Sequence, residues 1–151
     1  EGHGKTLTIS AENIVPKILN VAKDIRIALK NRLNNRFICL KIDSAKRLSR
    51  SVLGINAQFI EDGKIKLRTL SCHELQDRQT GATLKTMVHD TLAEYDIPLS
   101  QVYSITTDNG ANMLLAVQLL SSEAESNASD EGNTPLCLAF LGFHVYVVIV
   151  C

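Results

Sequence analysis

The sequence predicts an α/β protein in which an antiparallel three-strand meander is followed by a crossover helix and a parallel strand. Its 151 residues fit a single domain. Two apolar runs typical of buried strands, 36–42 and 102–107, are each followed by an aspartate, and helical patterns flank them. The hydrophobic content of 45% is that of a folded protein, which excludes disorder of the whole chain.

The N-terminal segment 1–35 is expected to form a basic amphipathic helix. Its apolar residues recur every three or four positions: Ile14, Ile18, Val21, Ala22, Ile25, Leu29 and Leu33. We expect Asn13 as the N-cap, Pro16 in the first turn and the end of the helix at Asn34. The outer face is basic through Lys17, Lys23, Arg26, Lys30 and Arg32. Such a face could be exposed to solvent, or it could contact DNA.

The meander is expected in the first half of the core. Residues 36–42 are dense in apolar and β-favouring side chains, so we expect a largely buried strand that ends at Asp43. Two further strands, 51–60 and 64–71, flank a turn at 61–63 that contains a glycine. Three consecutive strands with short links form an antiparallel sheet.

The second half of the core is expected to return to the first strand. A crossover helix capped by Thr80 precedes the buried strand 102–107, which ends in Asp108. A turn at 109–110 then leads to a helix over 111–120. The whole core therefore spans residues 36–120.

Two C-terminal segments differ from the core in composition. Residues 121–135 are small, acidic and poor in apolar side chains, so we expect a flexible linker. Residues 136–151 form an apolar tail that is shorter than the roughly 20 residues of a membrane-spanning helix. Its valine-rich half favours a strand, and we expect no membrane partner.

Charge is divided along the chain although the net charge is zero. Residues 1–85 contain all 16 Lys and Arg with eight acids, a formal charge of +8, and residues 86–151 contain eight acids alone. A basic face that meets an anion or a nucleic acid is consistent with this division. The four cysteines are scattered and include no CxxC pair, which favours reduced thiols inside a cell.

The two strand-end aspartates are the sharpest chemical feature. If the crossover returns its strand parallel to the first, Asp43 and Asp108 emerge at the same end of the sheet. Paired carboxylates there could share hard divalent cations, and two ions about 4 Å apart serve in-line displacement at phosphorus. Meander, crossover helix and parallel strand is the order of the RNase H-like fold. The alternative is that each aspartate only begins a turn.

Several motifs in the segment from Arg36 through Leu115 point to a known family. They are Leu40-Lys41-Ile42-Asp43, Ser51-Val52-Leu53-Gly54-Ile55-Asn56, the run Leu84 to Tyr95, and Ile105-Thr106-Thr107-Asp108-Asn109-Gly110-Ala111-Asn112-Met113. The last is similar to the family's T-x-D-N-x-x-N pattern. The segment resembles the RNase H-like catalytic core of hAT-family transposases.

The resemblance implies specific roles for these residues. Asp43 and Asp108 would be catalytic carboxylates that bind Mg²⁺ or Mn²⁺, weakly in this chain. Asn109 and Asn112 would support the motif, Asn109 by bracing the turn and Asn112 by capping or orienting the next helix. The resemblance also implies a nuclear protein whose partners are DNA and other transposase-like chains.

The sequence departs from the family pattern at several positions. Ala45 stands where the family often has Trp, and Gln79 stands where it has His. The family's third acid, a distant Glu, has no counterpart, because Glu123 and Glu125 lie in the expected linker. We therefore expect a truncated or domesticated relative that retains two of three metal-binding acids and does not cleave DNA by itself.

Other interpretations stay open at this stage. A domesticated module could bind DNA or protein without catalysis, and a truncated gene product could have no maintained function. Lys46, Arg47 and Arg50 follow Asp43 in sequence and are the expected DNA contacts. The run Gly2 to Thr6 ends like a phosphate-binding loop, but the first glycine of that motif is not in this sequence. We expect no small-molecule substrate.

Overall fold

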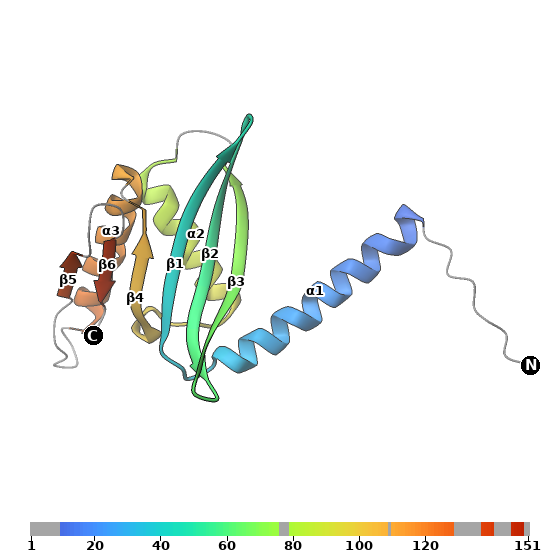
Figure 1. Ribbon diagram of the computed structural model, residues 1–151, viewed down its shortest axis with the longest axis horizontal. Coiled ribbons are helices and arrows are strands. Elements are labelled where there is room, and N and C mark those ends of the chain that lie inside the picture. The colour runs from blue at the N-terminus through green and yellow to red at the C-terminus, as the bar shows by residue number, and fades with distance from the viewer. Residues whose placement is uncertain (1–9, 76–78, 109, 129–136, 141–145, 150–151) are drawn as a thin grey trace, which may run out of the picture. The chain divides into compact units, whose positions relative to one another are not determined.

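A computed structural model describes most of the chain (Figure 1). The described residues are 10–75, 79–108, 110–128, 137–140 and 146–149. The chain divides into two compact units, Glu1–Arg32 and Leu33–Cys151, and each is described by itself.

The helix α1 runs from Ala11 to Leu33, and all but its last residue belongs to the first unit. Its end agrees with the sequence prediction, but its start does not. The carbonyl oxygen of Ser10 accepts hydrogen bonds from the amides of Asn13 and Ile14, and the Ser10 hydroxyl accepts from Asn13 at 3.3 Å. Ser10 therefore caps the helix in place of Asn13, and Pro16 lies inside the helix instead of in its first turn.

The predicted meander is confirmed in the second unit. Strands β1 (Ile38–Arg47), β2 (Arg50–Glu61) and β3 (Lys64–Leu75) pair antiparallel in chain order. The β2–β3 turn has positive φ at Asp62 and Gly63, as the glycine indicated. β1 extends beyond Asp43, where the sequence predicts the end of the strand, because residues 43–47 continue to pair with β2.

The predicted crossover is also confirmed. Helix α2 (Gly81–Glu94) begins at Thr80, whose hydroxyl accepts from the Thr83 amide at 3.2 Å. A short 3₁₀ turn η1 (Leu99–Gln101) leads into strand β4 (Val102–Thr107), which pairs parallel to β1. Helix α3 (Ala111–Ala128) begins as predicted but continues through residues 121–128, where the composition predicts a linker.

The strands form one mixed sheet. β5 (Cys137–Phe140) and β6 (Tyr146–Ile149) belong to the apolar tail, and β6 pairs antiparallel to β4. The strand order is β3-β2-β1-β4-β6-β5. The tail therefore includes strands, as its composition indicated, and part of it joins the core sheet.

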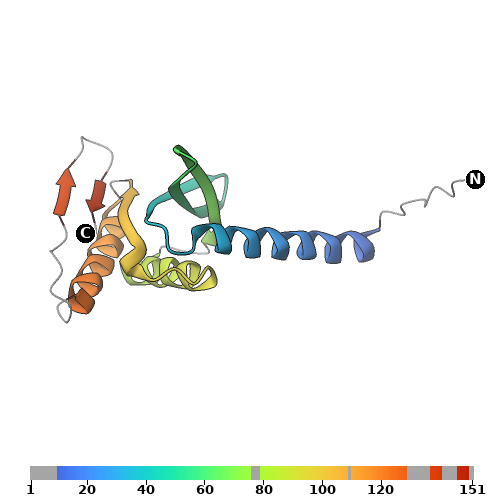
Figure 2. The ribbon, with the colours of Figure 1, turned by 90° about the horizontal axis from the view of Figure 1, so that it is seen from below.

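Helices α2 and α3 contact each other and lie on the same face of the sheet (Figure 2). That face carries an aliphatic core, with Leu40, Ile42, Leu53, Ile55 and Ile105 all at most 2% exposed. The protein is thus of the mixed α/β class. Among the described residues, no helix combines the length and the apolar character needed to cross a membrane.

Candidate functional site

The backbones of the two strand-end aspartates are neighbours in the sheet. The last paired residues of the parallel β1–β4 ladder are Ile42 and Thr107, and Asp43 and Asp108 follow them directly. Adjacent strands lie about 4.8 Å apart, so the two aspartates are close in space although they are far apart in sequence. Asp43 lies within β1, and β4 ends before Asp108.

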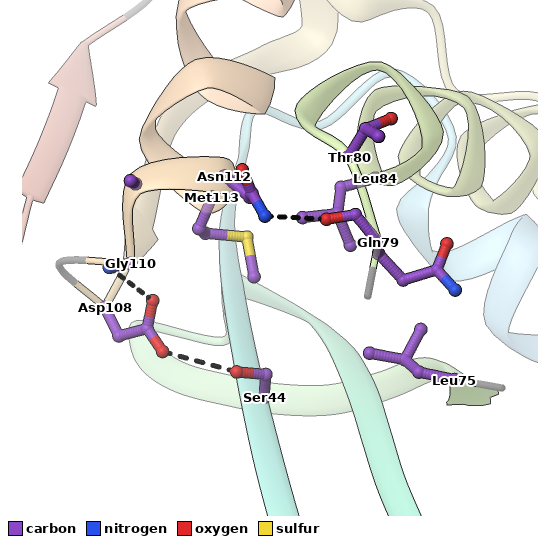
Figure 3. A pocket seen from close by; sticks show the side chains of 10 residues that line it. Ser44, Leu75, Gln79, Thr80, Leu84, Asp108, Gly110, Asn112 and Met113 are labelled. Carbon is purple, nitrogen blue, oxygen red and sulfur yellow. Dashed lines mark hydrogen bonds between the residues drawn. The ribbon is translucent and has the colours of Figure 1, made fainter. Parts of the chain in front are cut away.

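The Asp108 carboxylate is held by two hydrogen bonds. Its Oδ1 accepts from the Gly110 amide at 3.1 Å, and its Oδ2 accepts from the Ser44 hydroxyl at 3.4 Å (Figure 3). The bond to Gly110 is that of an Asx turn, in which an aspartate binds the backbone two residues ahead. It places a negative charge beside the start of α3, where the helix dipole favours an anion.

The side chains of Asp43 and Asp108 do not face the same way. Ser44 and the buried Ile42 share the face of β1 that α2 and α3 cover, because alternate residues of a strand point to the same side. Asp43 lies between them and is exposed, so its side chain projects from the other face. Ser44, and not Asp43, therefore contacts Asp108.

A cavity of about 620 Å³ opens beside Asp108 (Figure 3). Its lining comes from the ends of β1 and β3 and from the starts of α2 and α3: Ser44, Leu75, Gln79, Thr80, Leu84, Asp108, Gly110, Ala111, Asn112 and Met113. Two helix N-termini thus contribute to one cavity. The partial positive charge of these helix starts and the Asp108 carboxylate give it both positive and negative polar groups.

Asn112 joins the two helix starts. Its Nδ2 donates to the carbonyl oxygen of Gln79 at 2.8 Å, immediately before the Thr80 cap of α2. The resemblance implied that Asn112 caps or orients its own helix; this contact ties the start of α3 to the residue before α2. Asn109, the other motif residue, lies outside the described residues.

The three basic residues after Asp43 gather at the tip of the β1–β2 hairpin. Lys46 pairs with Ser51 in the strand register, and Arg47 pairs with Arg50. The Nε of Arg50 lies 3.1 Å from Oε1 of Glu74, and the Arg50 side chain is 76% exposed. These residues belong to strands instead of a loop. Lys46 and Arg50 do not line the cavity at Asp108, and the Arg47 side chain lies outside the described part of the structure.

Glu123 takes part in a contact between α2 and α3. Its Oε2 lies 2.6 Å from the Lys85 ammonium and 3.0 Å from Nε2 of His89. The hydrogen bond from Lys85 lowers the pKa of Glu123 below its usual value of 4.5, with a further contribution from His89. Glu123 does not line the cavity at Asp108, and the Glu125 side chain lies outside the described residues.

Sequence reasoning missed Ser44, the residue that touches Asp108. Alternation along β1 puts Ser44 on the same face as Ile42, but only because the strand continues past Asp43, where the sequence predicted its end. In the sequence, Gln79 was notable only as a departure from the family pattern. In the structure its backbone carbonyl accepts the hydrogen bond from Asn112.

The chain matches no protein-family model and no curated protein. Within the part of the chain that the structure describes, no group of three or more His, Cys, Asp or Glu side chains could hold a metal ion. The oxygen donors at Asp43 and Asp108 are nevertheless of the type that a hard divalent cation prefers.

Proposed function

We propose that this chain is a portion of an hAT-type DNA transposase with an RNase H-like core. In this proposal Asp43 and Asp108 are the first two metal-binding carboxylates, and the chain binds a divalent cation weakly without cutting DNA by itself. The observation that supports it is the parallel β1–β4 ladder, which brings the backbones of the two aspartates to adjacent positions. A nuclear location would follow from this family.

The residues fit Mg²⁺ or Mn²⁺ in donor type. Asp43 is exposed and Asp108 is half-buried at the mouth of a cavity, so an ion can reach both carboxylates. A bound cation would neutralise charge on a DNA phosphate. Ser44 and the Gly110 amide would orient Asp108, and the hairpin tip would meet the DNA backbone.

Absence of cleavage follows from the ligand count. A two-ion site must hold its ions within fractions of an ångström, and two carboxylates leave most coordination positions to water. We expect no nicking of a transposon-end duplex with Mn²⁺ or Mg²⁺. Robust nicking that Asp43→Asn abolishes would contradict this expectation and would show a complete active site.

Cation binding tests the site directly. Mn²⁺ titrated into the full chain should broaden NMR signals around residues 43 and 108, and Asp43→Asn or Asp108→Asn should each weaken the effect. Asp62→Asn is the matched control, because this exposed carboxylate lies in the β2–β3 turn. Equal broadening in all four proteins would refute the site.

A DNA-binding module without catalysis is the second candidate, supported by the basic residues at the hairpin tip. Removal of one basic group that binds a phosphate should lower the slope of log K against log salt by about one. Replacing Lys46, Arg47 and Arg50 by Ala should therefore weaken the binding of generic duplex DNA and flatten its salt dependence. The same replacement of Lys64, Lys66 and Arg68 in β3 is the control, and an equal effect would exclude a specific role for the tip.

A further inference from the structure

The helix α1 exposes a continuous apolar stripe. Its members are Ile14, Val15, Ile18, Leu19, Val21 and Ile25, which are between 37% and 63% exposed. Burial of aliphatic side chains is favourable, so a stripe of this extent is suited to contact with another apolar surface.

The spacing of the stripe is that of a helix pair. Ile14, Ile18, Val21 and Ile25 alternate steps of four and three, and Ala11 and Ala28 continue the pattern at each end. β-Branched residues occupy the centre of this seam, as is common where two helices pack against each other. Small residues at its ends permit close approach of two backbones.

Charged residues favour an antiparallel arrangement of two such helices. In a parallel pair, Arg32 continues the seam and would lie against the Arg32 of the other copy. In an antiparallel pair, residue n can lie opposite residue 39 − n, so that Ile14 packs on Ile25 and Ile18 on Val21. Arg32 then falls opposite residue 7, before the first residue of α1.

The same register brings opposite charges together. Lys17 and Asp24 lie one heptad apart on one edge of the stripe, and they have opposite sign. Antiparallel pairing places Lys17 of each helix beside Asp24 of the other, which forms two symmetry-related ion pairs. Along the opposite edge of the stripe, Val15 of each helix would lie beside Ala22 of the other, so that edge is apolar.

We propose that α1 is a self-association surface whose occupant is α1 of a second copy, paired antiparallel over residues 11–28. The polar side of α1 carries Lys23 and Arg26 and stays outside this interface. The proposal does not depend on the chemistry proposed for Asp43 and Asp108.

Analytical ultracentrifugation of the full chain tests this proposal. We expect a monomer–dimer equilibrium, and we expect Ile18→Asp to raise the dimer Kd by more than about tenfold, since both copies would place a charge in the seam. Ile27→Asp is the matched control: Ile27 is 49% exposed but lies roughly opposite the seam on the same helix. Circular dichroism checks that both variants keep their helix.

The charges test the orientation. Lys17→Glu should weaken the dimer by about two- to fivefold, and Lys17→Glu with Asp24→Lys should restore it. A zero-length carbodiimide cross-link should join Lys17 of one copy to Asp24 of another, because the two are about 10 Å apart within one helix. A monomer at every concentration, an Ile27→Asp effect as large as that of Ile18→Asp, or a dimer without this cross-link would overturn the proposal.

Discussion

At the scale of single residues, two buried threonines differ in how their hydroxyl groups are satisfied. The Thr91 hydroxyl donates to the Met87 carbonyl at 2.8 Å. Because the hydroxyl hydrogen already takes part in this bond, the Thr91 oxygen must accept from the Ser71 hydroxyl at 2.9 Å and from Nε2–H of His73 at 3.2 Å. The Thr107 hydroxyl is also buried but has no hydrogen-bond partner among the described residues.

This difference predicts opposite results for the same substitution. Thr91→Val should lower the free energy of unfolding by about 1–3 kcal/mol, because it removes a bonded hydroxyl and leaves the polar groups of its neighbours unpaired. Thr107→Val should leave stability unchanged or raise it by up to about 1 kcal/mol, because it replaces an unsatisfied polar atom by a methyl group. Urea unfolding of the two variants measures both values, and an equal loss in the two would contradict the assignment.

The Asp43–Asp108 site shows which features of a site can be predicted from residue patterns. The sequence placed both aspartates at strand ends, and the predicted crossover implied that their backbones would meet. The direction of each side chain could not be derived in the same way. It depends on where β1 stops, and residues 43–47 remain in the strand only because β2 pairs with them. Such long-range pairing leaves no local signal in a polar segment.

At the scale of elements, two contacts hold α2 and α3 against each other. A side-chain carbon added at Gly81 would lie 2.7 Å from Leu115, so only glycine permits the observed approach of the helix starts. Farther along the two helices, Glu123 contacts Lys85 and His89. This second contact lies in the part of α3 that was expected to be a linker. Because residues 121–128 lack an apolar stripe, the helical pattern could not predict them.

The lowered pKa of Glu123 predicts a specific dependence on pH. A carboxylate with a depressed folded-state pKa stabilises the protein above its unfolded pKa, near 4.5, and the contribution is lost as the pH falls through the lower folded value. The ion pair between Glu123 and Lys85 is partly exposed, so solvent screening limits its contribution to the free energy of unfolding to roughly 0.5 kcal/mol. Glu123→Gln should therefore be less stable than the parent at pH 7 and nearly equal to it at pH 3. A difference of the same size at both values would show that packing, and not charge, accounts for the effect.

At the scale of the whole molecule, the apolar tail completes the sheet next to the strand that leads to Asp108. Residues Tyr146–Ile149 of β6 pair with β4 from Ser104 to Thr107, and β5 pairs with β6 on the other side. Composition indicated strands in this tail, but it could not show which strand they would join. Without β6, β4 would become an edge strand with unpaired backbone groups beside the proposed site.

This pairing predicts the consequence of removing the tail. A chain ending at Ala128 should form fewer monomers and dimers and more aggregate than the parent, because an exposed strand edge pairs with other chains. Size-exclusion chromatography with light scattering measures the fractions, and removal of residues 1–9 serves as the control for shortening the chain. If the tail were instead an unpaired apolar remnant, its deletion would reduce aggregation. That result would contradict the β4–β6 pairing and would favour a truncated product whose last segment has no place in the fold.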